Sequence, residues 1–302
     1  MLVPALLAAA LSTPAAAADA EQGPITWGWQ PGEKVQFISE MLLDSPTVIW
    51  FFGVENTQAR MFRVEMRAQY ACVGESKGKR GFELTCDIED VSMSGTAVPK
   101  DQDQVDGILR EYEGILKKAQ VQIVTRPDGH ISLVDLENVS TGFIRENDIV
   151  EVLRQLVRRS VSPLGMQTPK GGNDPGRVWR HKGPNAFFEV MSKFGSSGGM
   201  RYEYAMAGMD GDVARITAEG KATVASNTQR EQGLPASLSL VASSSYRFDT
   251  AAGQVAYGEV AVNGVTTASY SLPGQTQGFG FGARVMRVNA DGSVEGPEGA
   301  VQ

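Results

Sequence analysis

Residues 69–88 read QYACVGESKGKRGFELTCDI, and this stretch decides the fold of the surrounding chain. Two runs of strand-forming residues flank a polar segment that contains three glycines, a pattern typical of a turn between two strands. If that turn is centred on Lys79, Cys72 and Cys86 face each other across an antiparallel hairpin, within reach of a disulfide bond. The stretch therefore predicts a hairpin that is closed by a structural Cys72–Cys86 disulfide.

Cys72 and Cys86 are the only cysteines in the chain. A disulfide that closes a loop of this size stabilises a protein by about 3 kcal/mol in the chain-entropy model. The alternative is a pair of reduced cysteines in the core. A catalytic thiol is disfavoured, because a reactive thiolate needs a partner that lowers its pKa and no histidine lies nearby in the sequence.

Strand patterns continue on both sides of the hairpin. Before it, residues 34–43 and 47–54 are rich in β-branched and aromatic residues. After it, turn sequences at Pro127-Asp128-Gly129, Asp210-Gly211, Ala251-Ala252-Gly253 and Asp291-Gly292 each separate two strand-like runs. At the first of these turns, the simplest register pairs Ile123 with Leu133 and Thr125 with Ile131.

Two segments have helical periodicity instead. Apolar residues recur at helical spacing over residues 103–119 and again over residues 146–161, so each segment predicts an amphipathic helix. Arg154, Arg158 and Arg159 form a basic edge on the second helix. We expect this edge to be solvated, and contact with anionic lipid headgroups is the alternative.

Together these patterns predict an α+β fold that is mostly antiparallel β. We expect a strongly curved sheet or incomplete barrel with two amphipathic helices packed on one face. Residues 21–302 are predicted to form a single β-rich domain. The proline- and glycine-rich segment at residues 162–176 offers a possible point of subdivision, although we favour a long loop there.

Residues 1–20 predict export. An apolar, alanine-rich run ends in Ala18-Asp19-Ala20, which fits the small-residue cleavage site of a signal peptide. No Lys or Arg precedes the run, so a disordered alanine-rich tail is the alternative. No later segment has the length of a membrane-spanning helix. We therefore expect a protein of the periplasm or the extracellular space, without a transmembrane segment in the mature chain.

Composition excludes several functions. The formal net charge of −7 argues against binding to nucleic acid, which depends on neutralising phosphates. Only two histidines are present, and His130 and His181 are both expected to be solvated. No metal-ligand motif and no phosphate-binding loop occur. The sequence therefore identifies no catalytic, cofactor-binding or metal-binding residue, and no cofactor is predicted.

Aromatic residues are the remaining feature. Tyr202, Tyr204 and Met206 share one face of a predicted strand, and Phe279 and Phe281 alternate with glycines. Core packing is one interpretation, and a curved sheet whose inner face leaves an apolar cavity is the other.

In element order and predicted export the chain resembles the periplasmic carriers of lipoproteins and lipids, whose unclosed barrels hold acyl chains beneath helices. This resemblance implies an apolar cavity without catalysis, and no binding residues can be carried over. Three hypotheses follow for the function. The first is a non-catalytic envelope protein with a structural or protein-interaction role, the second is a carrier or binder of a lipid or other apolar ligand, and the third is a carboxylate-based hydrolase. The partner is thus an apolar ligand or an envelope protein, and the sequence leaves the ligand and the oligomeric state open.

Overall fold

The fold is described from a computed structural model of the chain, which describes residues 25–52, 58–139, 146–169, 177–183, 200–225, 237–267 and 276–301. The predicted signal peptide at residues 1–20 lies outside these ranges, as do residues 170–176 of the predicted loop.

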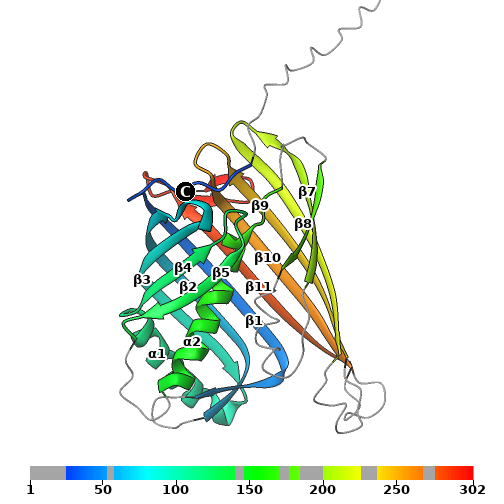
Figure 1. The fold of residues 1–302 in the computed structure, drawn as a ribbon. Helices are drawn as coiled ribbons and strands as arrows, with labels where there is room; N and C mark the ends of the chain where they lie inside the picture. Colours follow the sequence, from blue (N-terminus) through cyan, green and yellow to red (C-terminus); the bar gives the residue numbers. More distant parts are fainter. Residues whose placement is uncertain are drawn as a thin grey trace, which may run out of the picture.

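One antiparallel sheet dominates the described residues (Figure 1). Its strands are β1 (Lys34–Phe52), β2 (Gln58–Ser76), β3 (Phe82–Ala97), β4 (Gln120–Thr125), β5 (Ile131–Glu137), β6 (Val178–Gly183), β7 (Met200–Asp210), β8 (Val213–Ala225), β9 (Ser237–Asp249), β10 (Gln254–Thr267), β11 (Thr276–Val288), β12 (Val294–Gly296) and β13 (Gly299–Val301). The strand order is β5-β4-β3-β2-β1-β11-β10-β9-β8-β7-β6, with β12 and β13 attached beside β11. The sheet is open in the described part of the chain, and β5 and β6 are its edges.

Two α-helices accompany the sheet, α1 (Gln102–Leu116) and α2 (Glu146–Ser160), together with the 3₁₀ turns η1 (Gly78–Arg80), η2 (Pro99–Asp101) and η3 (Ser162–Gly165). Both α-helices have 15 residues, whereas β1 and β2 have 19 each. The prediction of an α+β fold with two amphipathic helices covering one face is therefore wrong, because the protein is largely β. The antiparallel sheet is confirmed, but its helices pack on only part of it.

Two corrections concern strands. The predicted runs at 34–43 and 47–54 join into the single strand β1, and the register with β2 shifts between Asp44 and Ile49, which allows the strand to bend and continue. In the β4–β5 hairpin, Thr125 pairs with Ile131 as predicted, but Leu133 pairs with Val124. A bulge between Val124 and Thr125 shifts the register by one residue, so the predicted pairing of Ile123 with Leu133 is wrong.

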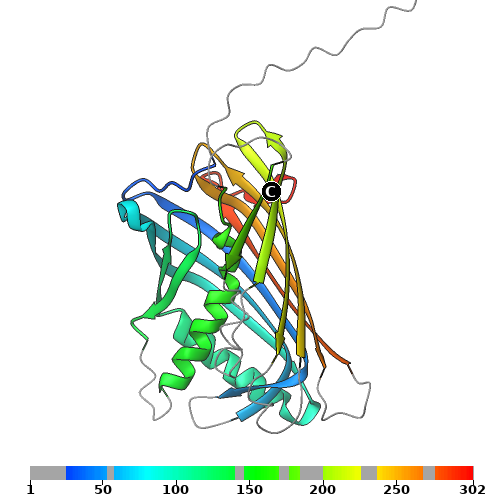
Figure 2. The same cartoon turned by 45° about the vertical axis from the view of Figure 1, so that its right-hand side comes forward.

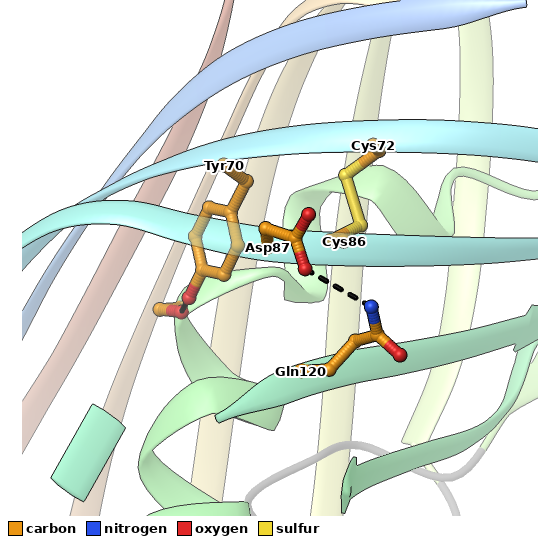
Figure 3. The surroundings of a disulfide bond; sticks show 6 residues. Tyr70, Cys72, Cys86, Asp87 and Gln120 are labelled. Atoms are coloured by element: carbon orange, nitrogen blue, oxygen red, sulfur yellow. Dashed lines mark hydrogen bonds between the residues drawn. A yellow bond between two sulfur atoms is a disulfide. The ribbon is translucent and has the colours of Figure 1, made fainter. Parts of the chain in front are cut away.

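The hairpin of β2 and β3 has the predicted register, and its cysteines pair directly (Figure 3). The Cys72–Cys86 disulfide is present and buried. On the opposite face of β3, the Asp87 carboxylate accepts a hydrogen bond from the Gln120 amide at 3.0 Å, which links β3 to β4. The disulfide thus joins β2 to β3 on the inward face of the sheet, where Cys86 lies level with Val121 of β4.

The two helices are fixed to specific strands. Gly95 of β3 allows α1 to approach closely, because an added Cβ would lie 3.0 Å from the Leu109 side chain. The Gln102 side chain then bonds the backbone of Gly95 and Ala97 at 2.9 and 3.0 Å. Helix α2 packs against β1, β5 and β11. Figures 1 and 2 show both helices beside the wall formed by β1–β5, while β7–β10 form the facing wall.

Candidate functional site

The inward face of the sheet is organised in continuous rows of side chains. Because residues that are paired across an antiparallel sheet point to the same side, the register defines each row. Three neighbouring rows run across seven strands from β7 to β2: Met206, Ile216, Tyr246, Gly258, Val285, Ser39 and Ala68; Tyr204, Ala218, Ser244, Val260, Ala283, Met41 and Met66; and Tyr202, Gly220, Ala242, Val262, Phe281, Leu43 and Val64. These rows contain no charged residue, so the inward face is apolar from one wall to the other.

The β8–β9 region of this face has the smallest side chains. Ala218 and Ser244 pair in one row, and Gly220 and Ala242 pair in the next, so four small residues form a block. Tyr202 and Met200 lie over Gly220, where an added Cβ would come within 2.8 Å of the Tyr202 ring. The contacts of α1 and α2 fall on β1, β2, β3, β5 and β11. The block therefore lies on the part of the inward face that these two helices leave to other residues.

Stacked aromatic rings lie beside this block at the inward face. Trp179 of β6 stacks on Tyr204 with ring centroids 5.4 Å apart, and Tyr204 stacks on Tyr246 at 6.5 Å. Burial raises the pKa of the Tyr246 hydroxyl to about 12, with a smaller opposing effect from Ser244, and burial also raises the pKa of Tyr204. The predicted shared face of Tyr202, Tyr204 and Met206 is therefore the inward face.

The segment Met166–Thr168 bridges the two edges of the open sheet. On one side, the Thr168 amide donates to the carbonyl of Asp128 in the β4–β5 turn at 2.9 Å. On the other side, the Trp179 ring donates to the Gln167 carbonyl at 3.0 Å. Trp27 donates to the Met166 carbonyl at 2.9 Å. We call this segment the bridge, since it joins edge strands that do not pair with each other in the described part of the chain.

Both histidines contact the bridge and are only partly exposed, which corrects the expectation of fully solvated rings. His181 Nε2 lies 3.1 Å from the Thr168 carbonyl, and His130 Nδ1 lies 3.3 Å from the Gln167 amide nitrogen. Because an amide nitrogen can only donate, His130 accepts this bond through Nδ1 in its neutral form. Burial lowers the pKa of His130, and the charge of Arg126 lowers it further.

The predicted basic edge of α2 is divided between two environments. Arg154 bonds the carboxylates of Asp135 and Glu151 at 2.9 and 2.6 Å. Arg159, by contrast, is only 8% exposed and pairs with no carboxylate in the described part of the chain. Its Nε atom is buried without a hydrogen-bond partner, and burial lowers the pKa of its guanidinium to about 10. The expected solvated edge is therefore wrong for Arg159, which still carries its charge at neutral pH.

Arg159 was the residue that sequence reasoning placed in the wrong environment. The helical pattern located it correctly on α2, but its burial arises from packing of α2 against strands that are distant in the sequence, since α2 contacts β1 and β11. The signal available in the sequence was its proximity to the apolar residues of the same helix. Carboxylates, in contrast, do not occur among the buried polar residues of the described ranges, so no enclosed acidic pair supports the hydrolase hypothesis.

None of the described helices has the length and apolar character needed to cross a membrane.

Comparison with known proteins gives a structural likeness but no sequence match. No family model matches the sequence, and no curated protein matches it significantly. Among solved structures, the chain is similar to lipovitellin, determined in a study of lipid–protein interactions, with a TM-score of 0.52 and 10% sequence identity. The match covers 87% of this chain and 26% of the lipovitellin chain, so this chain spans about a quarter of that protein. The likeness shows a shared fold of a large open antiparallel sheet.

Proposed function

We propose that the protein binds a lipid or another long apolar ligand on the inward face of its sheet and serves as a non-catalytic carrier. The observation that carries this proposal is the continuous apolar inward face. Its side chains are smallest on β8 and β9, at Ala218, Ser244, Gly220 and Ala242. Tyr202 and Met200 cover Gly220 in the ligand-free protein, so an acyl chain that binds over these small residues displaces those two side chains.

Two further observations support a carrier. The similar fold in lipovitellin belongs to a protein studied for its lipid interactions. The Cys72–Cys86 disulfide supports export, because disulfides persist in oxidising compartments such as the periplasm and the extracellular space. A carrier that moves lipid through water outside the cytoplasm needs both an enclosed apolar face and a chain that is stable there.

The test begins with protein purified from its own compartment. Native mass spectrometry is expected to detect a bound lipid, which organic extraction then identifies. The delipidated protein is expected to bind a neutral fluorescent fatty alcohol with one site. Absence of any bound lipid, together with no binding of the fatty alcohol, would contradict the proposal.

Adjacent serines of β9 offer a matched pair of variants. Ser244 points inward and is buried, whereas Ser243 is exposed on the outer face. Ser244→Phe places a ring on the inward face, and we expect it to weaken binding of the fatty alcohol by more than about tenfold through steric exclusion. Ser243→Phe is expected to bind normally. If the inward face is already filled, Ser244→Phe instead destabilises the protein by about 1–3 kcal/mol without a bound lipid to displace.

A further inference from the structure

We propose that Arg159 is the anchor for the carboxylate of a long-chain fatty acid whose acyl chain lies along the inward face. This inference rests on the proposed function and specifies its ligand class. Arg159 has no charged partner among the described residues. In this proposal the ligand carboxylate is that partner.

The geometry of α2 directs Arg159 toward β10 and β11. Successive helical residues are about 100° apart around the helix axis. Ser160 points to β2, since its hydroxyl lies 3.2 Å from the Tyr70 hydroxyl and itself donates to the Val157 carbonyl. Arg154 points to β5, where it bonds Asp135. Arg159 lies on the remaining side of α2, away from both contacts.

The next turn of the chain shows what faces that side. Pro163 of η3, four residues after Arg159, lies against β10, where an added Cβ on Gly258 would come within 3.0 Å of the Pro163 carbonyl oxygen and 3.1 Å of its ring. Gly258 belongs to the row that contains Tyr246 and Val285. Arg159 therefore lies at the margin of the apolar rows, on the side of α2 that faces β10 and β11.

An unpaired buried cation is costly for the free protein. Removing a charge from water without a compensating partner is among the largest unfavourable terms in folding. On the same helix Arg154 bonds the carboxylates of Asp135 and Glu151, whereas Arg159 bonds no carboxylate in the described part of the chain. An anion that enters with a ligand would provide the missing partner, because a guanidinium binds a carboxylate through two parallel hydrogen bonds.

Two more polar atoms without partners lie near Arg159 in the chain. Gln155 precedes it by one helical turn, and its side-chain oxygen is buried without a hydrogen bond within the described residues. The Ser162 hydroxyl is likewise buried and without a partner there. The Arg159 Nε–H and the Ser162 hydroxyl can both donate to a carboxylate, whereas the Gln155 oxygen only accepts and does not bind it. A fatty acid carboxylate fits this pattern better than a phospholipid headgroup, whose glycerol and phosphate carry more oxygens to satisfy.

The experiment compares oleate with oleyl alcohol, which have the same chain and differ in charge. Delipidated full-length protein is titrated with each by displacement of the fluorescent fatty alcohol. Wild type is expected to bind oleate about tenfold to a hundredfold more tightly, the range expected for a charge-assisted hydrogen-bonded pair. Arg159→Met is expected to remove this preference and to leave the affinity for oleyl alcohol unchanged.

A second readout separates ligand binding from a structural role. Arg159→Met removes a buried charge while retaining an apolar side chain, so the ligand-free variant is expected to unfold at the same or a higher urea concentration than wild type. Arg110→Met, which removes an exposed charge from α1, is the matched control and should keep the preference for oleate.

The outcomes are distinct. Equal affinities of wild type for oleate and oleyl alcohol would overturn the anchor and leave lipid binding intact. Tighter binding of dioleoyl phosphatidylglycerol than of oleate would overturn the fatty acid assignment. Failure to bind any of the three would overturn the proposed function together with this inference.

Discussion

The two walls of the sheet cover their apolar faces by different means. The wall of β1–β5 is packed by the chain's own helices, and its disulfide joins β2 to β3. The wall of β7–β10 instead carries small residues and stacked aromatic rings, with the bridge at its edge. Helices make a permanent core, whereas a face of small residues can accept a ligand. Under the proposed function, the first wall, β1–β5, provides stability and the second wall, β7–β10, binds the ligand.

Removal of a core side chain from the first wall should give the largest effect. Leu153 of α2 is fully buried, so Leu153→Ala loses its transfer free energy and leaves a cavity. We expect a loss of about 4 kcal/mol in the free energy of unfolding, measured by urea titration of the ligand-free protein. Val241→Ala on the outer face of β9, where the side chain is 52% exposed, should cost less than about 0.5 kcal/mol. Similar losses in both variants would contradict the assignment of stability to the first wall.

The disulfide tests the same wall through the unfolded state. The double variant Cys72→Ala/Cys86→Ala opens a loop whose ends are 14 residues apart. We expect it to lower the free energy of unfolding by about 3 kcal/mol, because the unfolded chain gains conformational freedom. Affinity for oleyl alcohol should stay within about twofold of wild type when the folded population is the same. A large loss of affinity would mean that the two walls do not act separately.

The bridge is expected to contribute less to the free energy of unfolding than the disulfide does. Trp27→Phe keeps an aromatic ring, whose wild-type counterpart packs against Phe248 at 5.3 Å, but removes the hydrogen bond to the Met166 carbonyl. Met166 is fully buried, so the carbonyl loses its protein partner without gaining water. We expect a loss of about 1–2 kcal/mol in thermal or urea unfolding. No change in stability would show that this contact does not help to hold the edges together.

The smallest expected effect is the pH dependence of the bridge. His130 has a lowered pKa in the folded protein, through burial first and then Arg126, with further contributions from Arg158 and His181 against an opposing one from Asp128. Since the folded state binds its proton less readily than the unfolded state, stability falls as the pH drops. His130 contributes fully above the unfolded-state pKa of about 6.5, and its contribution is lost as the pH falls towards the lower folded-state pKa.

His130→Gln is the test of this dependence. Unfolding of wild type and variant by urea at a series of pH values from 7.5 to 5 is expected to show a weaker decline in the variant, roughly in proportion to one titrating group. Parallel curves for the two proteins would assign the decline to groups other than His130.

Local sequence patterns predicted the hairpins well where a short turn controls the register. The cysteine hairpin and the Thr125–Ile131 pair both followed from the position of their turns. Patterns failed where a bulge intervenes, because a bulge inserts one residue without an obvious change in composition, as at Val124. The fold class was wrong for a related reason: two clear helical stripes were visible, while the full length of β1 became evident only through its pairing with β2 on both sides of the register shift between Asp44 and Ile49.

The candidate site could not be predicted from the sequence, for a different reason. Ala218, Ser244 and Arg159 are ordinary residues in their own segments, and none belongs to a motif. Their significance arises because the register places Ala218 beside Ser244, and because α2 and η3 meet β10 and β11. His130 and His181 were similarly expected in solvent, but the bridge lies against both.

By itself, the sequence determined an antiparallel β-rich chain with one disulfide, because alternation of side chains, turn residues and the spacing of two cysteines are local properties. Only the tertiary structure decided which face of each strand is enclosed, which wall the helices occupy and which arginines, Arg159 and Arg247, are buried. Those properties depend on contacts between segments that are far apart in the chain, and such contacts leave little trace in the composition of either segment.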